Sequence, residues 1–312
     1  TKYGDPWSIK RMDRVFEVKF GGQIEVHRDE FGKEYFKRVN TETVHAVAYD
    51  VPVIGYGNDT VNTLRLWEAR SPEGFDLKLF NDQTYLQASA KAVQAEDISR
   101  VLYPNDTEKD GKQLRLKQQF FFTSASLQDI IRRYKSVFGN DFSKFAEKVA
   151  IQLNDTHPVV AIPELMRIFL DKEKLGWDEA WNICKNVFAY TNHTILSEAL
   201  EKWDISLFQP LLPRIYQIIE EINRRFVAEL QEKYPGDWER INKMSIIGNG
   251  QVRMAWLAIV GSHKVNGVAK LHTEILKNTE LKEWNELYPE KFLNKTNGIT
   301  QRRWLLKANP EL

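Results

Sequence analysis

The chain has 312 residues, of which 42% are hydrophobic and 28% charged, and its formal net charge is +1. These values are typical of a soluble globular protein with one large or two modest domains and a sizeable core. The near-zero charge gives no electrostatic reason to expect binding to nucleic acid or to an acidic membrane surface. No apolar run approaches the length that spans a bilayer, so we expect neither nucleic acid nor membrane among the partners.

The single cysteine, Cys184, cannot form an internal disulfide. A lone thiol favours a reducing compartment, and we expect a cytoplasmic location. The first residues contain no initiator Met and no secretory pattern, and the last ones stop just beyond an apparent helix. Both ends are therefore expected to be cuts within a longer chain.

The first part of the chain is expected to be rich in strands, because β-branched and aromatic residues alternate or cluster between turn signals. The expected strands are Val15–Phe20, Gln23–His27, Thr43–Val51 and Asn62–Arg70. Helical spacing then takes over. It predicts helices at Asp82–Leu102 and Leu114–Phe138, joined by the polar loop Tyr103–Gly111.

A strand-helix-strand rhythm follows. The strand-like run Lys148–Leu153 ends in the polar turn Asn154–Pro158, and helices are expected at Val159–Lys172 and from Trp177. A second strand-like run, Asn186–Tyr190, ends in Thr191–Thr194, which we expect to open a helix. This rhythm predicts an α/β fold with a mainly parallel sheet flanked by helices, after an N-terminal β-rich portion.

The remaining elements are mostly helical. A long amphipathic helix is predicted at Phe208–Lys233, because apolar residues recur on one stripe at Leu211, Ile215, Ile218, Ile222, Phe226 and Leu230. Further helices are expected near Val252–Val260 and Val268–Leu276. The run Lys291–Leu293 then leads into the small polar residues Asn294–Gly298.

Three strand-like runs thus end in polar residues, and ligands bind beyond the carboxyl ends of strands in open parallel sheets. The candidate residues are Asp155 with His157, Asn192 with His193 and Thr194, and Asn297. Helix caps and loop punctuation explain any one of these segments equally well. The recurrence of a histidine in two such turns favours a common site.

The residue types at this site bear on several kinds of chemistry. His157, His193 and Asp155 could ligate a divalent metal, but their spacing matches no compact metal motif. Nucleophile, P-loop and dinucleotide motifs are missing. Amides, hydroxyls and carboxylates, together with nine tryptophans, suit a polyhydroxylated ligand, although tryptophans are more often core residues. Composition and spacing therefore predict an α/β domain with a polar pocket.

Several segments together resemble the α-glucan (glycogen) phosphorylases, with the character of the fungal cytosolic enzymes. The matching segments are Val149–Pro158, Tyr190–Thr194, Glu198–Glu201, Lys295–Thr300, Asn62–Trp67, Val101–Asp106 and Val265–Ala269. They keep their order and cover nearly the whole chain.

The resemblance implies reversible phosphorolysis of terminal α-1,4-glucosyl units of glycogen or another glucan by inorganic phosphate, giving α-glucose 1-phosphate. It implies pyridoxal phosphate as a proton relay, a homodimer, and an architecture of two Rossmann-like lobes with the active site between them. Residues 1–294 would belong to the N-terminal lobe, which binds glucan and carries regulation. Residues 295–312 would begin the C-terminal cofactor lobe.

The resemblance also implies roles for individual residues. His193 would bind the glucosyl unit and turn its main-chain carbonyl toward the developing oxocarbenium charge. Asn297 would bind sugar hydroxyls and Val268 would line the pocket. The cleft wall and its support would come from Asp155, His157, Asn192, Thr194 and Glu201.

Three further roles lie outside the sugar pocket. Asp106 would lie on a loop that gates substrate access, and Trp304 would pack near the cofactor. The pair Arg132 and Arg133 would receive a regulatory phosphoryl group or nucleotide phosphate, unless it is a solvated helix face.

By resemblance, the cofactor lysine and the residues that grip the substrate phosphate lie outside this chain. We therefore expect the 312 residues alone to have no phosphorylase activity. One alternative is a non-catalytic carbohydrate-binding or regulatory domain. Another is a metal-dependent hydrolase that uses His157 and His193.

Overall fold

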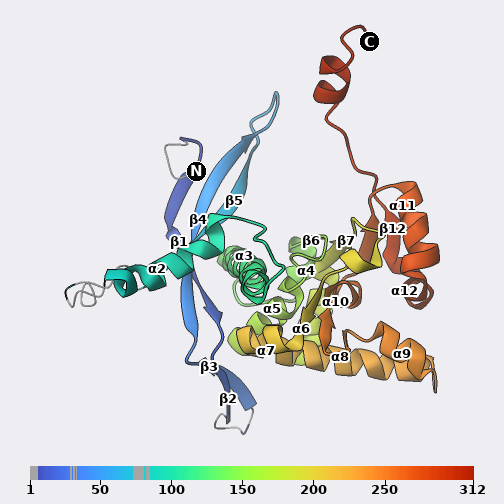
Figure 1. The fold of residues 1–312 in the computed structure, drawn as a ribbon, viewed down its shortest axis with the longest axis horizontal. Coiled ribbons are helices and arrows are strands. Elements are labelled where there is room, and N and C mark those ends of the chain that lie inside the picture. The colour runs from blue at the N-terminus through green and yellow to red at the C-terminus, as the bar shows by residue number, and fades with distance from the viewer. Residues whose placement is uncertain (1–5, 29, 31, 33, 73–80, 82–84) are drawn as a thin grey trace.

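A four-stranded parallel sheet organises the second half of the chain (Figure 1). The computed structural model describes residues 6–28, 30, 32, 34–72, 81 and 85–312. The sheet has the order β12-β11-β7-β6, and all three neighbouring pairs run parallel. Its strands are β6 (Ile151–Asn154), β7 (Phe188–Thr191), β11 (Lys264–Gly267) and β12 (Phe292–Asn294). Because the pairing is parallel, all four carboxyl ends lie at one edge.

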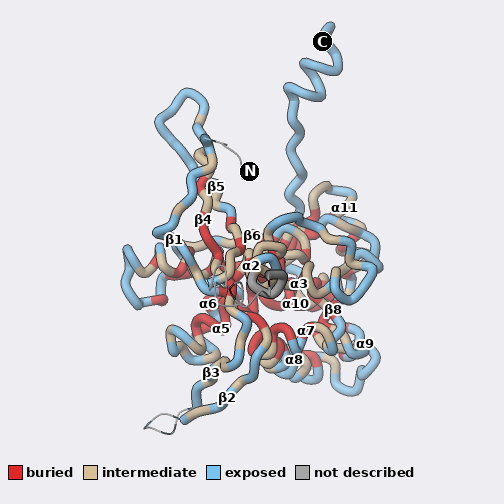
Figure 2. The backbone as a smooth tube through the Cα atoms, turned by 60° about the vertical axis from the view of Figure 1, so that its left-hand side comes forward, coloured by how far each residue is buried: buried red, intermediate tan, exposed pale blue. Residues whose placement is uncertain are grey.

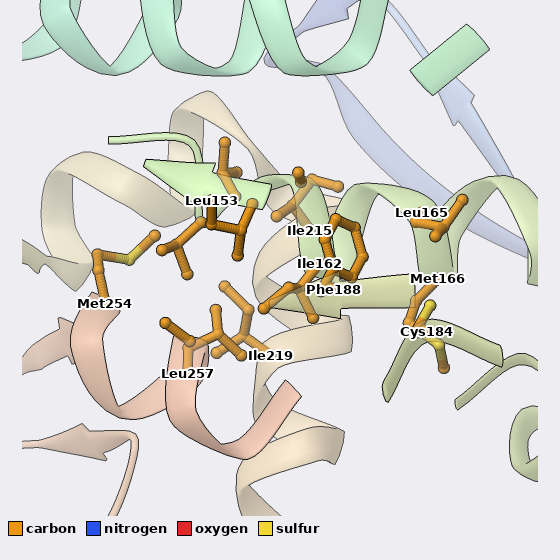
Figure 3. Close-up of a cluster of buried hydrophobic side chains, with 14 of the residues drawn as sticks. Leu153, Ile162, Leu165, Met166, Cys184, Phe188, Ile215, Ile219, Met254 and Leu257 are labelled. Atoms are coloured by element: carbon orange, nitrogen blue, oxygen red, sulfur yellow. The ribbon is translucent and has the colours of Figure 1, made fainter. Parts of the chain in front are cut away.

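Helices connect and cover these strands. They are α5 (Ala161–Arg167) with its π-helical continuation η1 (Ile168–Lys172), α6 (Trp177–Val187), α8 (Pro213–Lys233), α10 (Met254–Gly261), α11 (Lys270–Ile275) with η3 (Leu276–Glu280), and α12 (Lys282–Leu287). Figure 3 shows Leu153 of β6 and Phe188 of β7 among side chains of α5, α8 and α10. This apolar cluster fixes the sheet and hence the position of its carboxyl edge.

The N-terminal portion is antiparallel. Strands β1 (Ile9–Phe20), β4 (Glu42–Ile54) and β5 (Val61–Arg70) form a sheet in the order β1-β4-β5. Strands β2 (Gln23–Arg28) and β3 (Glu34–Val39) form a separate hairpin. The 30-residue helix α3 (Lys109–Phe138) packs against both β1 and α5, so it joins the two parts of the molecule (Figure 1).

The remaining elements are mostly short. A small antiparallel sheet has the order β8-β10-β9. Its three strands fall between β7 and β11 in the chain. These elements are α2 (Tyr85–Arg100), α4 (Phe145–Lys148), η2 (Ser197–Ala199), β8 (Lys202–Asp204), α7 (Ile205–Leu211), α9 (Trp238–Met244), β9 (Ile247–Gly248), β10 (Gln251–Arg253), η4 (Pro289–Lys291) and η5 (Arg302–Lys307).

The predicted mixed α/β class is confirmed, with a parallel sheet and a β-rich N-terminal portion. The predicted apolar stripe is also confirmed, because all six of its residues are buried. The predicted helix that carries the stripe is divided, however. It becomes α7 and α8, which meet at Leu212 because Pro213 has no N–H and begins a new helix.

The predicted helix after Thr191–Thr194 is wrong. The Asn192 side-chain oxygen accepts a hydrogen bond from the Thr194 N–H at 3.0 Å, and the Thr194 hydroxyl accepts one from the Leu196 N–H at 3.0 Å. These two local turns satisfy the backbone without helix formation. The chain continues through the 3₁₀ turn η2 into β8.

Other boundaries also differ from the predictions. Helix α3 begins at Lys109, inside the segment predicted to be a loop. Strands β3, β11 and the small sheet were not predicted. The predicted helix Asp82–Leu102 is described only in part: residues 82–84 lie outside the described residues, and α2 ends at Arg100.

The last residues leave the body of the molecule. Residues 294–312 are exposed, and Figures 1 and 2 show the C-terminal segment running outward from β12.

Candidate functional site at the carboxyl edge of the parallel sheet

The turns that follow the parallel strands are tied to one another by their backbones. The Asp155 N–H donates to the Thr191 carbonyl at 2.9 Å, and the Asn192 N–H donates to the Asn266 carbonyl at 2.9 Å. The Lys295 N–H donates to the Gly267 carbonyl at 3.0 Å. The structure therefore places the turns after β6, β7, β11 and β12 side by side at one edge.

The turn after β6 begins with Asp155, a non-glycine residue with φ of 65°. Its carboxylate accepts a hydrogen bond from the N–H of Thr156 at 2.6 Å. Asp and Asn tolerate this left-handed conformation better than most residues because their short side chains bond locally. The chain turns sharply here, and Asp155 and His157 are left half-buried.

The turn after β7 carries one buried and one exposed site residue. Asn192 is buried, and its amide donates to the Tyr190 hydroxyl at 3.2 Å. His193 is exposed, and its Nε2 lies 2.5 Å from the side-chain oxygen of Asn154 at the end of β6. Among the described residues, no hydrogen bond reaches the main-chain carbonyl of His193.

A row of polar side chains crosses three strands just behind this edge. The Gln152 amide donates to the Thr191 hydroxyl at 2.8 Å, and that hydroxyl donates to the Asn266 side-chain oxygen at 2.8 Å. The sequence placed Thr191 in the polar turn, but Gln152 and Asn266 were not singled out as candidates, and both lie within strands. Neutral donors and acceptors that are already oriented by one another suit recognition of sugar hydroxyls.

The turns after β11 and β12 bring Val268 and Asn297 together. The Asn297 N–H donates to the Val268 carbonyl at 3.0 Å. Val268 is half-buried, whereas Asn297 is exposed. The amide side chain of Asn297 is therefore accessible at the same edge that carries His193.

A charged cluster forms beside the turn after β6. The Arg115 guanidinium, on α3, donates to the Asp106 carboxylate at 2.9 Å, and its Nε lies 3.4 Å from the Glu201 carboxylate. The Gln119 amide donates to both Glu201 oxygens, at 3.0 and 3.2 Å. Sequence reasoning named Asp106 and Glu201 but missed Arg115 and Gln119, which occupy ordinary helical positions.

Burial raises the pKa of the Glu201 carboxyl above its ordinary value. The Gln119 hydrogen bond and the charges of Arg115 and His157 oppose this rise, whereas the charge of Asp155 adds to it. Glu201 is thus electrostatically linked to both Asp155 and His157, and the three predicted residues belong to one neighbourhood.

A small cavity of about 190 Å³ adjoins this cluster. Its lining includes His157, Arg115 and Gln119, with apolar surface from Leu102, Tyr103 and Phe122. The Tyr103 ring meets the His157 ring edge to face, with centroids 5.9 Å apart. His193 and Asn297 do not line this cavity, and they are exposed on the open edge instead.

Arg132 and Arg133 lie elsewhere, near the end of α3. They are 17 or more residues beyond Arg115, or roughly 25 Å along the helix. Arg132 donates twice to Asp129, at 2.8 and 3.0 Å, and Asp129 also accepts from Arg65 at 2.7 Å. Arg132 is thus already paired with a carboxylate, whereas Arg133 is exposed.

Trp304 lies on the outward C-terminal segment, and 64% of its surface is exposed. All residues of η5 around it are exposed as well. The described residues therefore leave Trp304 largely open to solvent.

Among the described residues, no group of three or more His, Cys, Asp or Glu side chains could hold a metal ion. In the same part of the chain, no helix combines the length and apolar character required to cross a bilayer.

The chain is similar to known proteins along its whole length. The family model for carbohydrate phosphorylases matches residues 1–312. The chain is 52% identical to the muscle form of glycogen phosphorylase from Mus musculus, 51% to the brain form from Homo sapiens and 48% to the glycogen phosphorylase of Chlamydia pneumoniae. Each comparison covers 100% of this chain and 38% of the relative, so the chain spans well under half the length of these proteins.

Proposed function

Because the chain belongs to the carbohydrate phosphorylase family, we propose that it supplies the sugar-binding side of an α-glucan phosphorylase active site. The reaction is reversible phosphorolysis of a terminal α-1,4-glucosyl unit by inorganic phosphate, with α-glucose 1-phosphate as product. The observation that carries the proposal is the meeting of four polar turns at one edge of the parallel sheet. This is where α/β proteins bind ligands.

His193 has the central role in the proposed site. Its ring is oriented by Asn154, and its main-chain carbonyl has no partner among the described residues. A carbonyl dipole held in place stabilises positive charge that develops at the anomeric carbon during bond cleavage. Because that charge appears only near the transition state, the interaction accelerates the reaction beyond simply holding the sugar.

The other predicted residues surround the glucosyl unit. Asn297 and Val268 form one wall, because the Asn297 N–H is bonded to the Val268 carbonyl. Asn192 and Thr194 shape the turn that carries His193. Asp155, His157 and Glu201 form the opposite wall, and Asp106 holds the gating loop to that wall through Arg115.

Further parts of the proposal concern the longer protein. Pyridoxal phosphate would supply a phosphate group for proton transfer, held mainly by residues outside this chain, with Trp304 beside it. Residues 1–294 would belong to one lobe and 295–312 would open a second, which agrees with the outward course of the last residues. A homodimer, a cytoplasmic location and phosphate binding at Arg132 and Arg133 stay predictions.

Two measurements on the 312-residue chain test the proposal. Maltopentaose is titrated into ¹⁵N-labelled protein, and we expect shifts at residues 154–157, 192–194, 267–268 and 297 that weaken in His193→Ala. Shifts confined to other surfaces would contradict the proposed site. We also expect no release of α-glucose 1-phosphate from glycogen and phosphate, and measurable release would overturn the expected inactivity of the isolated chain.

An assay of the natural full-length protein distinguishes the proposed function from the alternative of a non-catalytic carbohydrate-binding domain. Sugar binding at the same residues without any phosphorolysis by that protein would favour the alternative.

A further inference from the structure

His272 contacts the proposed sugar-binding wall through the backbone of Val268. It lies in the first turn of α11, and its Nδ1 accepts a hydrogen bond from the Val268 N–H at 3.0 Å. Neither the strand-end pattern nor the family resemblance drew attention to this residue. It lies four positions after Val268, inside a segment predicted only as a helix.

The tautomer of the neutral ring follows from this bond. Because Nδ1 accepts, the neutral imidazole must carry its proton on Nε2. The Nε2 atom is buried and has no hydrogen-bond partner among the described residues. The bond to Val268 is therefore the polar contact that sets the orientation of the ring.

The bond to Val268 continues to Asn297. The peptide on one side of Val268 donates to His272, and the Val268 carbonyl accepts from the Asn297 N–H at 3.0 Å. If Val268 rotates, the acceptor for Asn297 moves with it. His272 thus acts on Asn297 through the backbone of Val268.

The surrounding loop leaves little freedom for another arrangement. A Cβ atom added at Gly267 would lie 2.4 Å from the Thr273 hydroxyl and 3.1 Å from Nδ1 of His272. The Thr273 hydroxyl is also within 2.9 Å of the Ala269 carbonyl and of the Asn294 side-chain oxygen. The start of α11 therefore packs directly on the ends of β11 and β12.

We propose that His272 is a positioning residue that fixes the Val268–Asn297 wall for binding of the terminal glucosyl unit. The assignment of that wall to sugar rests on the proposed function. The link from His272 to Val268 and Asn297 rests only on the hydrogen bonds described above. His272 would act through the backbone of Val268 and not through a contact with the sugar.

Two substitutions distinguish the effect of the hydrogen-bond acceptor Nδ1 from the effect of the size of the ring. His272→Asn keeps an acceptor at the position of Nδ1, whereas His272→Phe keeps a ring and removes the acceptor. Amide hydrogen exchange at Val268 and Asn297 is measured in the free chain, and maltopentaose affinity is measured by titration. We expect His272→Phe to speed exchange at both amides and to weaken affinity by about tenfold, the effect of one lost hydrogen bond.

His272→Asn is expected to stay within about twofold of the unsubstituted chain in both measurements, because its acceptor is retained. A role limited to capping α11 would leave exchange at Asn297 unchanged in His272→Phe, and this result would overturn the proposal. Equal losses in the Asn and Phe variants would also overturn it, because the acceptor would then not matter.

The same data separate failure of the inference from failure of the proposed function. The unsubstituted chain could fail to bind maltopentaose while amide exchange at Val268 and Asn297 is faster in His272→Phe but not in His272→Asn. This result would contradict the proposed sugar site and support the backbone link. If sugar binds but neither variant alters exchange, the positioning role is contradicted and the sugar site stands.

Discussion

The ring of His193, on the turn after β7, is hydrogen-bonded to the side-chain oxygen of Asn154, the last residue of β6. Because Asn154 Oδ1 accepts, the proton of the neutral ring lies on Nε2. We expect Asn154→Leu to release the ring and weaken maltopentaose binding by about three- to tenfold, as the loss of one hydrogen bond predicts. Titration monitored by NMR measures this effect.

Asn186→Leu is the matched control, because Asn186 is exposed on α6 and its side chain bonds to Asn182 within the same helix. Unchanged affinity in Asn154→Leu would show that the ring needs no support from β6.

Arg115 joins the loop of Asp106 to the half-buried carboxylate of Glu201. Gly111, in the first turns of α3, packs so closely on this loop that an added Cβ would lie 1.8 Å from the Asn105 carbonyl. Arg115→Met removes both charged contacts, and we expect amide exchange in residues 103–107 to accelerate by about tenfold. Hydrogen exchange with mass spectrometry measures the change.

The control for this prediction is Arg133→Met, which removes an exposed arginine from the same helix. Equal acceleration in the two variants would mean that the loop responds to loss of α3 charge in general and not to the Arg115 contacts.

Glu201 predicts a pH-dependent contribution to stability. Burial raises its pKa in the folded state above the ordinary value of 4.5. The protonated form is therefore favoured by folding, and this stability is present below pH 4.5 and is lost as the pH rises through the folded-state pKa. The glutamine side chain in Glu201→Gln cannot ionise. The unfolding free energy of this variant, relative to that of the unsubstituted chain, should therefore increase as the pH rises from acidic to neutral.

Urea unfolding of the two proteins across that range measures the relative stability. A difference that does not change with pH would show that Glu201 ionises equally easily in the folded and unfolded chain.

Glu164 and Arg167 form a fully buried ion pair on α5, with Glu164 0% and Arg167 4% exposed. The Ser124 hydroxyl on α3 donates to the same carboxylate at 2.6 Å. Burial works against ionisation of Glu164, but the charge and hydrogen bonds of Arg167 outweigh it and keep the pKa below its ordinary value. Glu164→Gln leaves Arg167 as a buried unpaired cation and should cost about 3–5 kcal/mol of unfolding free energy.

Glu221→Gln is the contrasting change, because the pairs of Glu221 with Arg224 and Arg225 lie on the surface of α8. Its expected cost is at most about 1 kcal/mol. Similar midpoints of urea unfolding for Glu164→Gln and the unsubstituted chain would contradict the importance of the buried pair.

Much of the fold could be predicted from local patterns. The apolar stripe of α8 recurs at helical spacing, and its residues are buried as predicted. The turn Asn154–Pro158 follows a strand as predicted, because an apolar run followed by small polar residues marks the end of a buried strand. Strand β11 could not be predicted in this way, because the four residues Lys264–Gly267 contain one strongly apolar residue, and pairing with β7 and β12 makes them a strand.

The order of residues by itself determined which side chains stand at the ends of β6, β7 and β12, since hydrophobic periodicity and turn chemistry act between near neighbours. The family resemblance of the whole chain also came from that order alone. Tertiary structure decided which helical residues reach this edge. Gln119 bonds to Glu201 across 82 positions, and His272 holds Val268 because α11 packs on the ends of β11 and β12. Such contacts depend on how the core brings distant segments together, and no local pattern encodes that distance.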